Sequence, residues 1–90
     1  CDDKTKKTIH TVEIRGFVYA PVIVKAKVGD TMTWVNHDIV PHTSTAKDDS
    51  WDTGSIEKGD SKSVVVTADM VLDYYCRFHP MMIAKIELQS

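Results

Sequence analysis

Residues 74–82 read Tyr-Tyr-Cys-Arg-Phe-His-Pro-Met-Met (YYCRFHPMM) and place a thiol, an imidazole and two thioethers in one short segment. Thiolate, imidazole nitrogen and thioether sulfur are soft or borderline ligands, and together they favour copper over hard cations. The alternative is structural, because a free cysteine such as Cys76 is commonly a small buried apolar side chain. The rest of the chain decides which interpretation applies.

Short strands separated by turns account for most of the chain around this segment. Residues 9–15 alternate so that His10, Val12 and Ile14 share one face, which is typical of a strand with one buried side. The expected strands occupy residues 9–15, 17–20, 22–28, 31–36, 63–67, 71–76 and 83–88. No window keeps a helical period for three turns, so the sequence predicts an all-β fold, an antiparallel sandwich or barrel.

The composition limits the classes of protein to consider. Ninety residues, 42% of them hydrophobic, suit one small domain. A net charge of -2 argues against nucleic-acid binding, which needs a basic face. No apolar run approaches the length of a membrane span, and no segment reads as a signal peptide. We expect a flexible tether at residues 1–7 and a single domain over residues 8–90.

A second segment supplies the ligand that residues 74–82 lack. Residues 34–43 read Trp-Val-Asn-His-Asp-Ile-Val-Pro-His-Thr (WVNHDIVPHT) and contain His37 and His42. Two histidines and one cysteine with a weak axial methionine form the arrangement of electron-transfer copper sites. Taken together, WVNHDIVPHT followed by YYCRFHPMM resembles the type 1 copper proteins called cupredoxins, within them the amicyanin and plastocyanin group.

The resemblance implies a Greek-key β-sandwich of about seven to eight strands. It also implies one copper ion, Cu(I) or Cu(II), held by His42, Cys76, His79 and Met82. His42 follows a proline, as in the family, whereas we expect His37 to be a solvated loop residue. Spacing favours Met82 as the axial ligand over the adjacent Met81, which is then an exposed contact residue, but the choice between the two stays open.

Two positions depart from the family pattern. The residue after the upstream histidine is often an asparagine, whose side chain is hydrogen-bonded to the residue after the cysteine. Here these positions are Thr43 and Arg77. Whether the two loops are still braced against each other is therefore an open question, and hydrogen bonds near a thiolate tune its potential.

The resemblance implies a monomer that shuttles single electrons between redox partners. Four protein ligands leave no open position for a substrate, which predicts a protein that is not an enzyme. Electrons are expected to enter at the edge of His79, where partners dock briefly on an apolar patch. That patch consists of Pro41, Phe78, Pro80 and Met81. Two alternatives stay open: a periplasmic copper buffer or carrier with the same ligands, and a structural zinc site, against which the methionine argues.

Cys1 carries a further prediction. A chain that starts with cysteine and a short charged segment (CDDKTKK) resembles a processed bacterial lipoprotein. We expect a periplasmic or other extracytoplasmic location, with membrane attachment through a lipid on Cys1. The alternatives are a surface thiol and a Cys1–Cys76 disulfide, which metal ligation by Cys76 would exclude.

Overall fold

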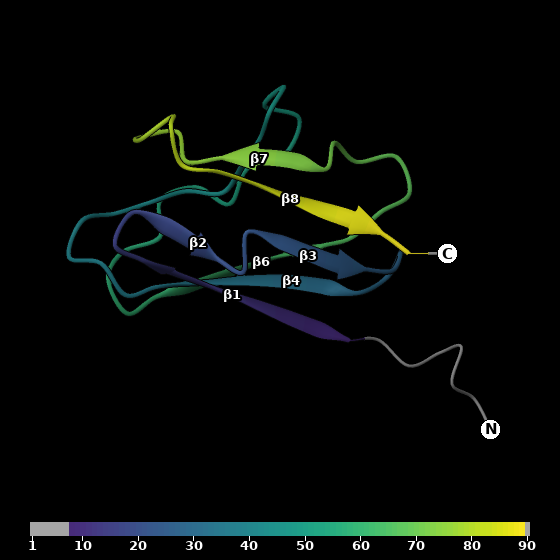
Figure 1. Ribbon diagram of the computed structural model, residues 1–90, viewed down its shortest axis with the longest axis horizontal. Helices are drawn as coiled ribbons and strands as arrows, with labels where there is room; N and C mark the ends of the chain where they lie inside the picture. Colours follow the sequence, from purple (N-terminus) through teal and green to yellow (C-terminus); the bar gives the residue numbers. More distant parts are fainter. Residues whose placement is uncertain (1–7, 90) are drawn as a thin grey trace.

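The computed structural model describes residues 8–89, so the expected tether and Cys1 lie outside the described residues. Within that range the chain forms eight strands (Figure 1): β1 (Ile9–Arg15), β2 (Val18–Ala20), β3 (Ile23–Ala26), β4 (Thr31–Asn36), β5 (Thr45–Ala46), β6 (Ser61–Val65), β7 (Asp73–Tyr75) and β8 (Ile83–Leu88). No helix among the described residues is long and apolar enough to cross a membrane.

The strands form two four-stranded sheets that pack face to face. One has the order β2-β1-β4-β6 and the other the order β3-β8-β7-β5. The prediction of an all-β sandwich is confirmed. Both sheets are mixed, because β1 pairs with β4 in parallel and β3 pairs with β8 in parallel, while the remaining pairs are antiparallel.

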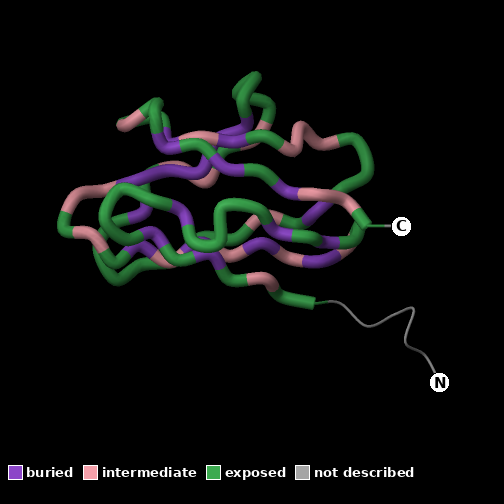
Figure 2. The backbone as a smooth tube through the Cα atoms, in the orientation of Figure 1, coloured by how far each residue is buried: buried purple, intermediate pink, exposed green. Residues whose placement is uncertain are grey.

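The core fills the space between the sheets. Val12 and Ile14 on β1 and Met32 and Trp34 on β4 have no exposed surface, as the alternation in these segments predicts. Figure 2 shows buried segments on strands of both layers. The core cluster contains Val12, Ile14, Tyr19, Val24, Ala26, Met32, Trp34, Ile56, Val66, Tyr74, Cys76, Met82, Ala84 and Ile86. It includes the thiol and one thioether of residues 74–82, so the candidate ligands lie against the core.

Some expected strand limits are wrong. The expected strand 17–20 begins only at Val18, because Phe17 has a left-handed backbone with φ 63° and lies in the turn after β1. The expected strand 63–67 is instead Ser61–Val65, where exposed Ser61 and Lys62 pair with β4 although the apolar run starts later. The short strand β5 was not expected, since its two residues carry no detectable alternation.

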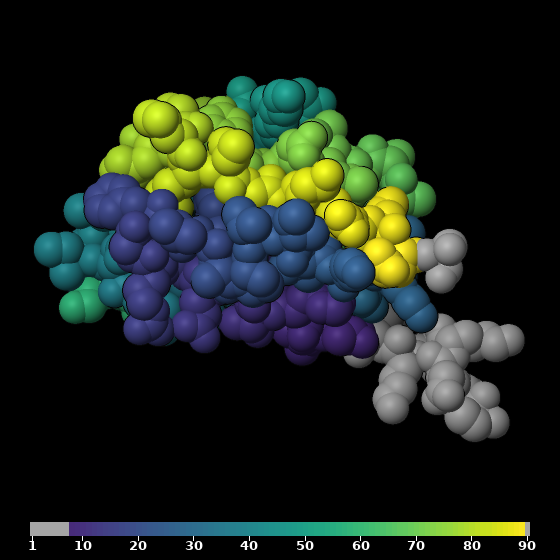
Figure 3. Space-filling model, viewed as in Figure 1, coloured from purple at the N-terminus to yellow at the C-terminus, as the bar shows by residue number. Residues whose placement is uncertain are grey.

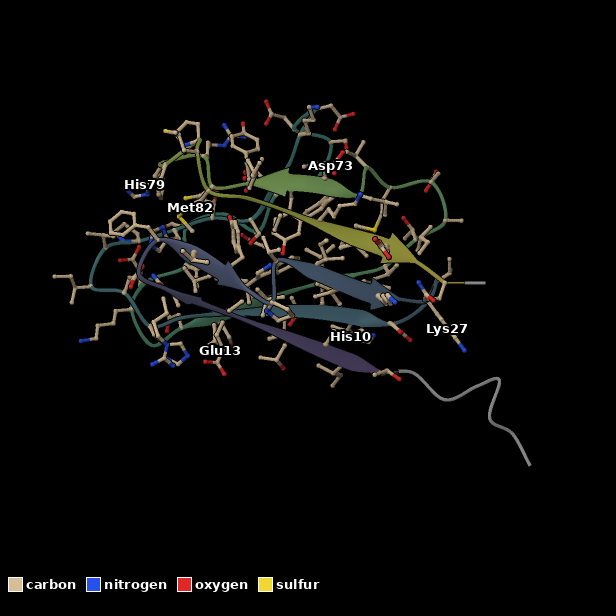
Figure 4. The ribbon with its side chains drawn as sticks, viewed as in Figure 1. His10, Glu13, Lys27, Asp73, His79 and Met82 are labelled. Atoms are coloured by element: carbon tan, nitrogen blue, oxygen red, sulfur yellow. The ribbon has the colours of Figure 1, made fainter. Side chains whose placement is uncertain are left out.

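Three segments meet at one end of the sandwich: the β1–β2 turn, the loop after β4, and the β7–β8 loop. Figure 3 shows the dark-blue chain of the β1–β2 hairpin and the yellow-green chain of the β7–β8 loop side by side. In Figure 4, His79 and Met82 lie at this end and Lys27 lies at the other.

Candidate metal centre

Three potential ligands converge between the loop after β4 and the β7–β8 loop. The Sγ atom of Cys76 lies 3.5 Å from Nδ1 of His42 and 3.7 Å from Nδ1 of His79. All three ligand atoms lie within 4.8 Å of one another. Metal–sulfur and metal–nitrogen bonds of about 2.3 and 2.0 Å at tetrahedral to trigonal angles separate the sulfur and nitrogen atoms by roughly 3.5–3.7 Å. The two sulfur–nitrogen distances therefore suit a shared ion.

The β7–β8 loop owes its compact shape to three backbone hydrogen bonds. The Cys76 N–H donates to the Met82 carbonyl (3.0 Å), the His79 N–H to the Cys76 carbonyl (3.1 Å), and the Met82 N–H to the His79 carbonyl (2.9 Å). Steps of three residues thus return the chain to nearly the same point. Met82 is 6% exposed and Met81 is 93% exposed, so Met82 faces the interior and Met81 faces solvent. This burial favours Met82 over Met81 as the thioether ligand.

His42 is fully buried, and the backbone holds it in place from both sides. Its N–H donates to the Ile56 carbonyl (3.1 Å) and its carbonyl accepts the Ile56 N–H (2.7 Å). Asn36, at the end of β4, shapes the loop that leads to it by donating to the carbonyls of Val40 and Ile56. His37 is exposed and its Nε2 lies 3.5 Å from a carboxylate oxygen of Glu13, away from the cluster, as predicted.

Thr43 answers the question of how the two loops are braced. Its Oγ1 accepts the Arg77 N–H at 2.8 Å, so a threonine hydroxyl here makes the connection that an asparagine side chain makes in the family pattern. Its own N–H points at Cys76 Sγ at 3.4 Å. An N–H directed at sulfur stabilises the thiolate, which is the form that binds a metal.

Tyr19, on β2, supports the same loop from the core side. Its hydroxyl donates to the Thr43 carbonyl. Burial raises the pKa of Tyr19 above its usual value, so the hydroxyl keeps its proton and remains a donor.

Asp38 lies beside the cluster, and the sequence analysis did not identify it. Its Oδ1 accepts the Gly16 N–H (2.7 Å), and its Oδ2 lies 3.0 Å from the Phe17 nitrogen and 2.8 Å from His42 Nε2. Burial by itself raises the pKa of Asp38, but the N–H groups of Phe17 and Gly16 and the His42 ring lower it by more, so the pKa lies below its usual value. Asp38 is therefore ionised at neutral pH.

The ring of Phe17 covers both imidazoles. Its centroid lies 5.2 Å from that of His42 and 4.7 Å from that of His79, with interplanar angles of 85° in both pairs. These are edge-to-face contacts. The only sequence signal for Phe17 was an aromatic residue after a glycine, which does not distinguish a cover over a site from the start of a strand.

Several apolar side chains are exposed on the segments that meet at this end of the sandwich. Met81 and Phe78, two members of the expected patch, are 93% and 48% exposed. Ile39 and Phe17 are exposed by 82% and 47%, and the sequence analysis did not include them.

Comparison with known proteins agrees with this geometry. Residues 6–89 match the model of the copper-binding proteins of the plastocyanin/azurin family. The chain belongs to this family. It is a cupredoxin, as the two sequence motifs predicted, and copper is its cofactor. The donor set fits this ion, since a buried thiol, two imidazoles and a buried thioether are ligands that copper prefers.

Amicyanin is the relative that recurs in these comparisons. The chain is 28% identical to amicyanin of Paracoccus denitrificans over 83 residues, which are 87% of this chain and 63% of the relative. It therefore spans less than two thirds of that protein. Its fold is similar to a solved Cu(I) form of an amicyanin mutant (TM-score 0.80, 27% identity, covering 93% of this chain and 85% of the other). A reduced amicyanin mutant gives a TM-score of 0.77 at 29% identity, covering 90% and 82%.

Proposed function

We propose that this cupredoxin shuttles single electrons between redox partners through a type 1 copper centre held by His42, Cys76, His79 and Met82. The observation that supports this most strongly is the convergence of a buried thiol and two imidazoles within 4.8 Å in a chain of a copper-binding family. Copper, when bound, alternates between Cu(I) and Cu(II) and so carries one electron at a time.

The surroundings of the ligands suit an electron carrier better than an enzyme. His42 and Cys76 are fully buried and Met82 is 6% exposed, so little solvent reaches this side of the site. Four protein donors leave no position at which a substrate could bind. The backbone bonds within the β7–β8 loop and the Thr43 contacts hold the donors in one arrangement, which limits rearrangement between oxidation states.

Electrons are proposed to pass through His79, because it is the partly exposed member of the ligand set. Partners would dock on the apolar patch of Pro41, Phe78, Pro80 and Met81, to which we add Phe17, whose ring meets that of His79. A small patch of this kind supports brief, weak association.

The first experiment adds one equivalent of Cu(II) to the metal-free protein and records visible absorption and electron paramagnetic resonance. An intense thiolate-to-copper band is expected, and it should be absent in a Cys76→Ser variant. Weak, colourless binding would reject the type 1 centre. Rapid loss of copper to a chelator during redox cycling would favour the copper buffer or carrier over the electron shuttle.

Docking at the patch can be tested without an identified partner, through electron self-exchange between two copies of the protein. Self-exchange is measured from NMR line broadening in mixtures of the Cu(I) and Cu(II) forms. A Met81→Lys variant places charges of the same sign at the contact, so its rate should fall at least tenfold at low salt, with an unchanged copper spectrum. The control is Val28→Lys, since Val28 is 55% exposed and lies in the turn before β4. Equal rates in the two variants would refute docking through Met81.

An extracytoplasmic location and a lipid on Cys1 complete the proposal and rest on the resemblance to lipoproteins. Intact-mass measurement of the protein from its native membrane tests the lipid, because acyl chains add mass that an unmodified chain lacks.

A further inference from the structure

One carboxylate at the metal centre connects two separate parts of the fold. Asp38 accepts hydrogen bonds from the backbone of the β1–β2 turn, at Gly16 and Phe17, and its Oδ2 lies 2.8 Å from Nε2 of His42. Its side chain is 14% exposed. The Asp38 N–H donates to Asn36 Oδ1 at 2.8 Å, which fixes the start of the loop and with it the direction of the carboxylate.

This arrangement determines which nitrogen of His42 faces the metal. Nδ1 lies 3.5 Å from Cys76 Sγ, on the side of the cluster, and Nε2 lies 2.8 Å from Asp38 Oδ2. Both oxygens of the Asp38 side chain already accept backbone N–H groups, so this side chain is arranged as an acceptor and the His42 ring is placed to donate its proton from Nε2. The lone pair of Nδ1 is then free for a metal ion. A hydrogen bond from the distal ring nitrogen to a carboxylate also makes the ligating nitrogen more basic.

The same carboxylate holds the aromatic cover. Phe17 has φ 63°, a left-handed backbone that is unfavourable for a bulky residue and persists where the surroundings enforce it. The Phe17 N–H donates to Oδ2 of Asp38, the oxygen that also contacts His42. The bonds to Gly16 and Phe17 therefore keep the turn in the conformation that places the Phe17 ring over His42 and His79.

We propose that Asp38 is a positioning residue of the copper centre, which orients His42 for ligation and holds Phe17 over both imidazoles. Its negative charge, transmitted through the His42 ring, favours Cu(II) over Cu(I). This inference rests on the proposed ligation of copper by His42, but not on electron transfer to any partner.

The first test uses the metal-free protein, so it is independent of the proposed function. Long-range proton–nitrogen NMR correlations report which ring nitrogen of His42 is protonated. We expect the proton on Nε2 in the native chain and in an Asp38→Glu variant, and loss of this single state in Asp38→Asn. The asparagine side chain has one accepting oxygen, so it cannot accept hydrogen bonds from Gly16, Phe17 and His42 together. A proton on Nδ1 in the native chain would overturn the proposal, whether or not the protein transfers electrons.

The second test measures copper binding and the midpoint potential. In Asp38→Asn we expect Cu(II) affinity to fall by roughly 10–100-fold, as for other residues that orient a ligand. We expect the preference for Cu(II) over Cu(I) to fall about tenfold, which raises the potential by about 59 mV for one electron. Asp38→Glu, which keeps the charge, should lie closer to the native protein in both quantities.

The matched control is Asp60→Asn, which removes the same charge from an exposed turn before β6. A shift of equal size in the control would overturn the proposal, because it would show an effect of overall charge alone.

A Phe17→Leu variant separates the two roles of Asp38, which are to orient His42 and to hold Phe17: the His42 proton should stay on Nε2 while copper is released faster to a chelator. If Asp38→Asn does not fold, the His42 proton in the native chain and in Asp38→Glu still decides the question. A native chain that binds no copper but has the proton on Nε2 would refute the proposed function and leave the orienting role of Asp38 supported.

Discussion

Replacing Thr43 by valine should destabilise the protein well beyond the loss of one surface hydroxyl. Thr43 is 2% exposed, and its Oγ1 lies 2.8 Å from the Arg77 nitrogen and 3.0 Å from Thr45 Oγ1. Thr45 in turn donates to Asp52 at 2.9 Å. The hydroxyl of Thr45 is thus committed to Asp52, so Thr43 must donate to Thr45 and accept from Arg77. The hydrogen bonds form one chain across the two ligand loops.

Valine keeps the volume and the branched shape of Thr43, so it leaves no cavity. It removes the acceptor for the Arg77 N–H and the donor to Thr45. Thr43 and Thr45 are buried, and a polar group left without a partner at a buried site costs about 1–3 kcal/mol. For a domain of this size, whose free energy of unfolding is about 5–15 kcal/mol, that is a large fraction. A loss of about 2 kcal/mol lowers the melting temperature by roughly 8–16 °C.

The assay is urea unfolding of the metal-free protein, so that copper binding does not contribute. Thr33→Val is the matched control, because the Thr33 hydroxyl meets Ser63 Oγ at 2.9 Å at an exposed position on β4 and its loss should cost less than about 0.5 kcal/mol. Thr43→Ser keeps the hydroxyl and should regain most of the lost stability. If Thr43→Val loses no more than Thr33→Val, the hydrogen-bond chain contributes no net stability and the reasoning is wrong.

Two further predictions concern stability. The N–H of Lys27, with His10 and other donors, lowers the pKa of Asp30 to about 2, which is below the pKa of this group in the unfolded chain. The ionised Asp30 therefore contributes its full stability above about pH 4, and this contribution is lost as the pH falls towards 2. Asp30→Asn should flatten this part of the acid unfolding curve. An equally steep curve in the variant would contradict this. Tyr19→Phe removes the buried donor to the Thr43 carbonyl and should cost about 1–3 kcal/mol in urea unfolding. The control is Tyr75→Phe, which loses an exposed hydrogen bond to Asp49 and should cost less than about 0.5 kcal/mol. Equal losses in the two variants would reject the role of burial.

The sequence was sufficient for the features that depend on neighbouring residues. Alternation placed Val12 and Ile14 in the core, and the resemblance of Cys-x-x-His to the cupredoxin ligand loop implied that Cys76 and His79 lie together, because both patterns are contained within a few residues of chain. The exposed Met81 and buried Met82 also agree with the expected roles of the two residues.

The contacts that hold the site could not be found in this way. Asp38 and His42 lie in an irregular loop, where no period relates the direction of one side chain to that of another. The hydrogen bonds of Asp38 to Gly16 and Phe17 depend on the packing of β1 beside β4. This pairing is parallel, and the expected antiparallel sheet did not contain it. The sequence showed that Thr43 departs from the family pattern. Whether its hydroxyl reaches the backbone at Arg77 depends on the distance between the loop after β4 and the β7–β8 loop, which the sequence does not give.

The aromatic core shows why the fold and the metal centre are stabilised together. The rings of Tyr19 and Tyr74 meet at 4.9 Å, and Tyr74 lies on β7 directly before the ligand loop. The hydroxyl of Tyr19 reaches in the other direction, to the carbonyl of Thr43 next to His42. One core residue therefore sets the position of both ligand loops relative to each other. Since interiors are close-packed, a shift in this core would be transmitted to the distance between His42 and Cys76. The geometry of the donors is thus a consequence of packing between the sheets, in addition to the conformation of each loop.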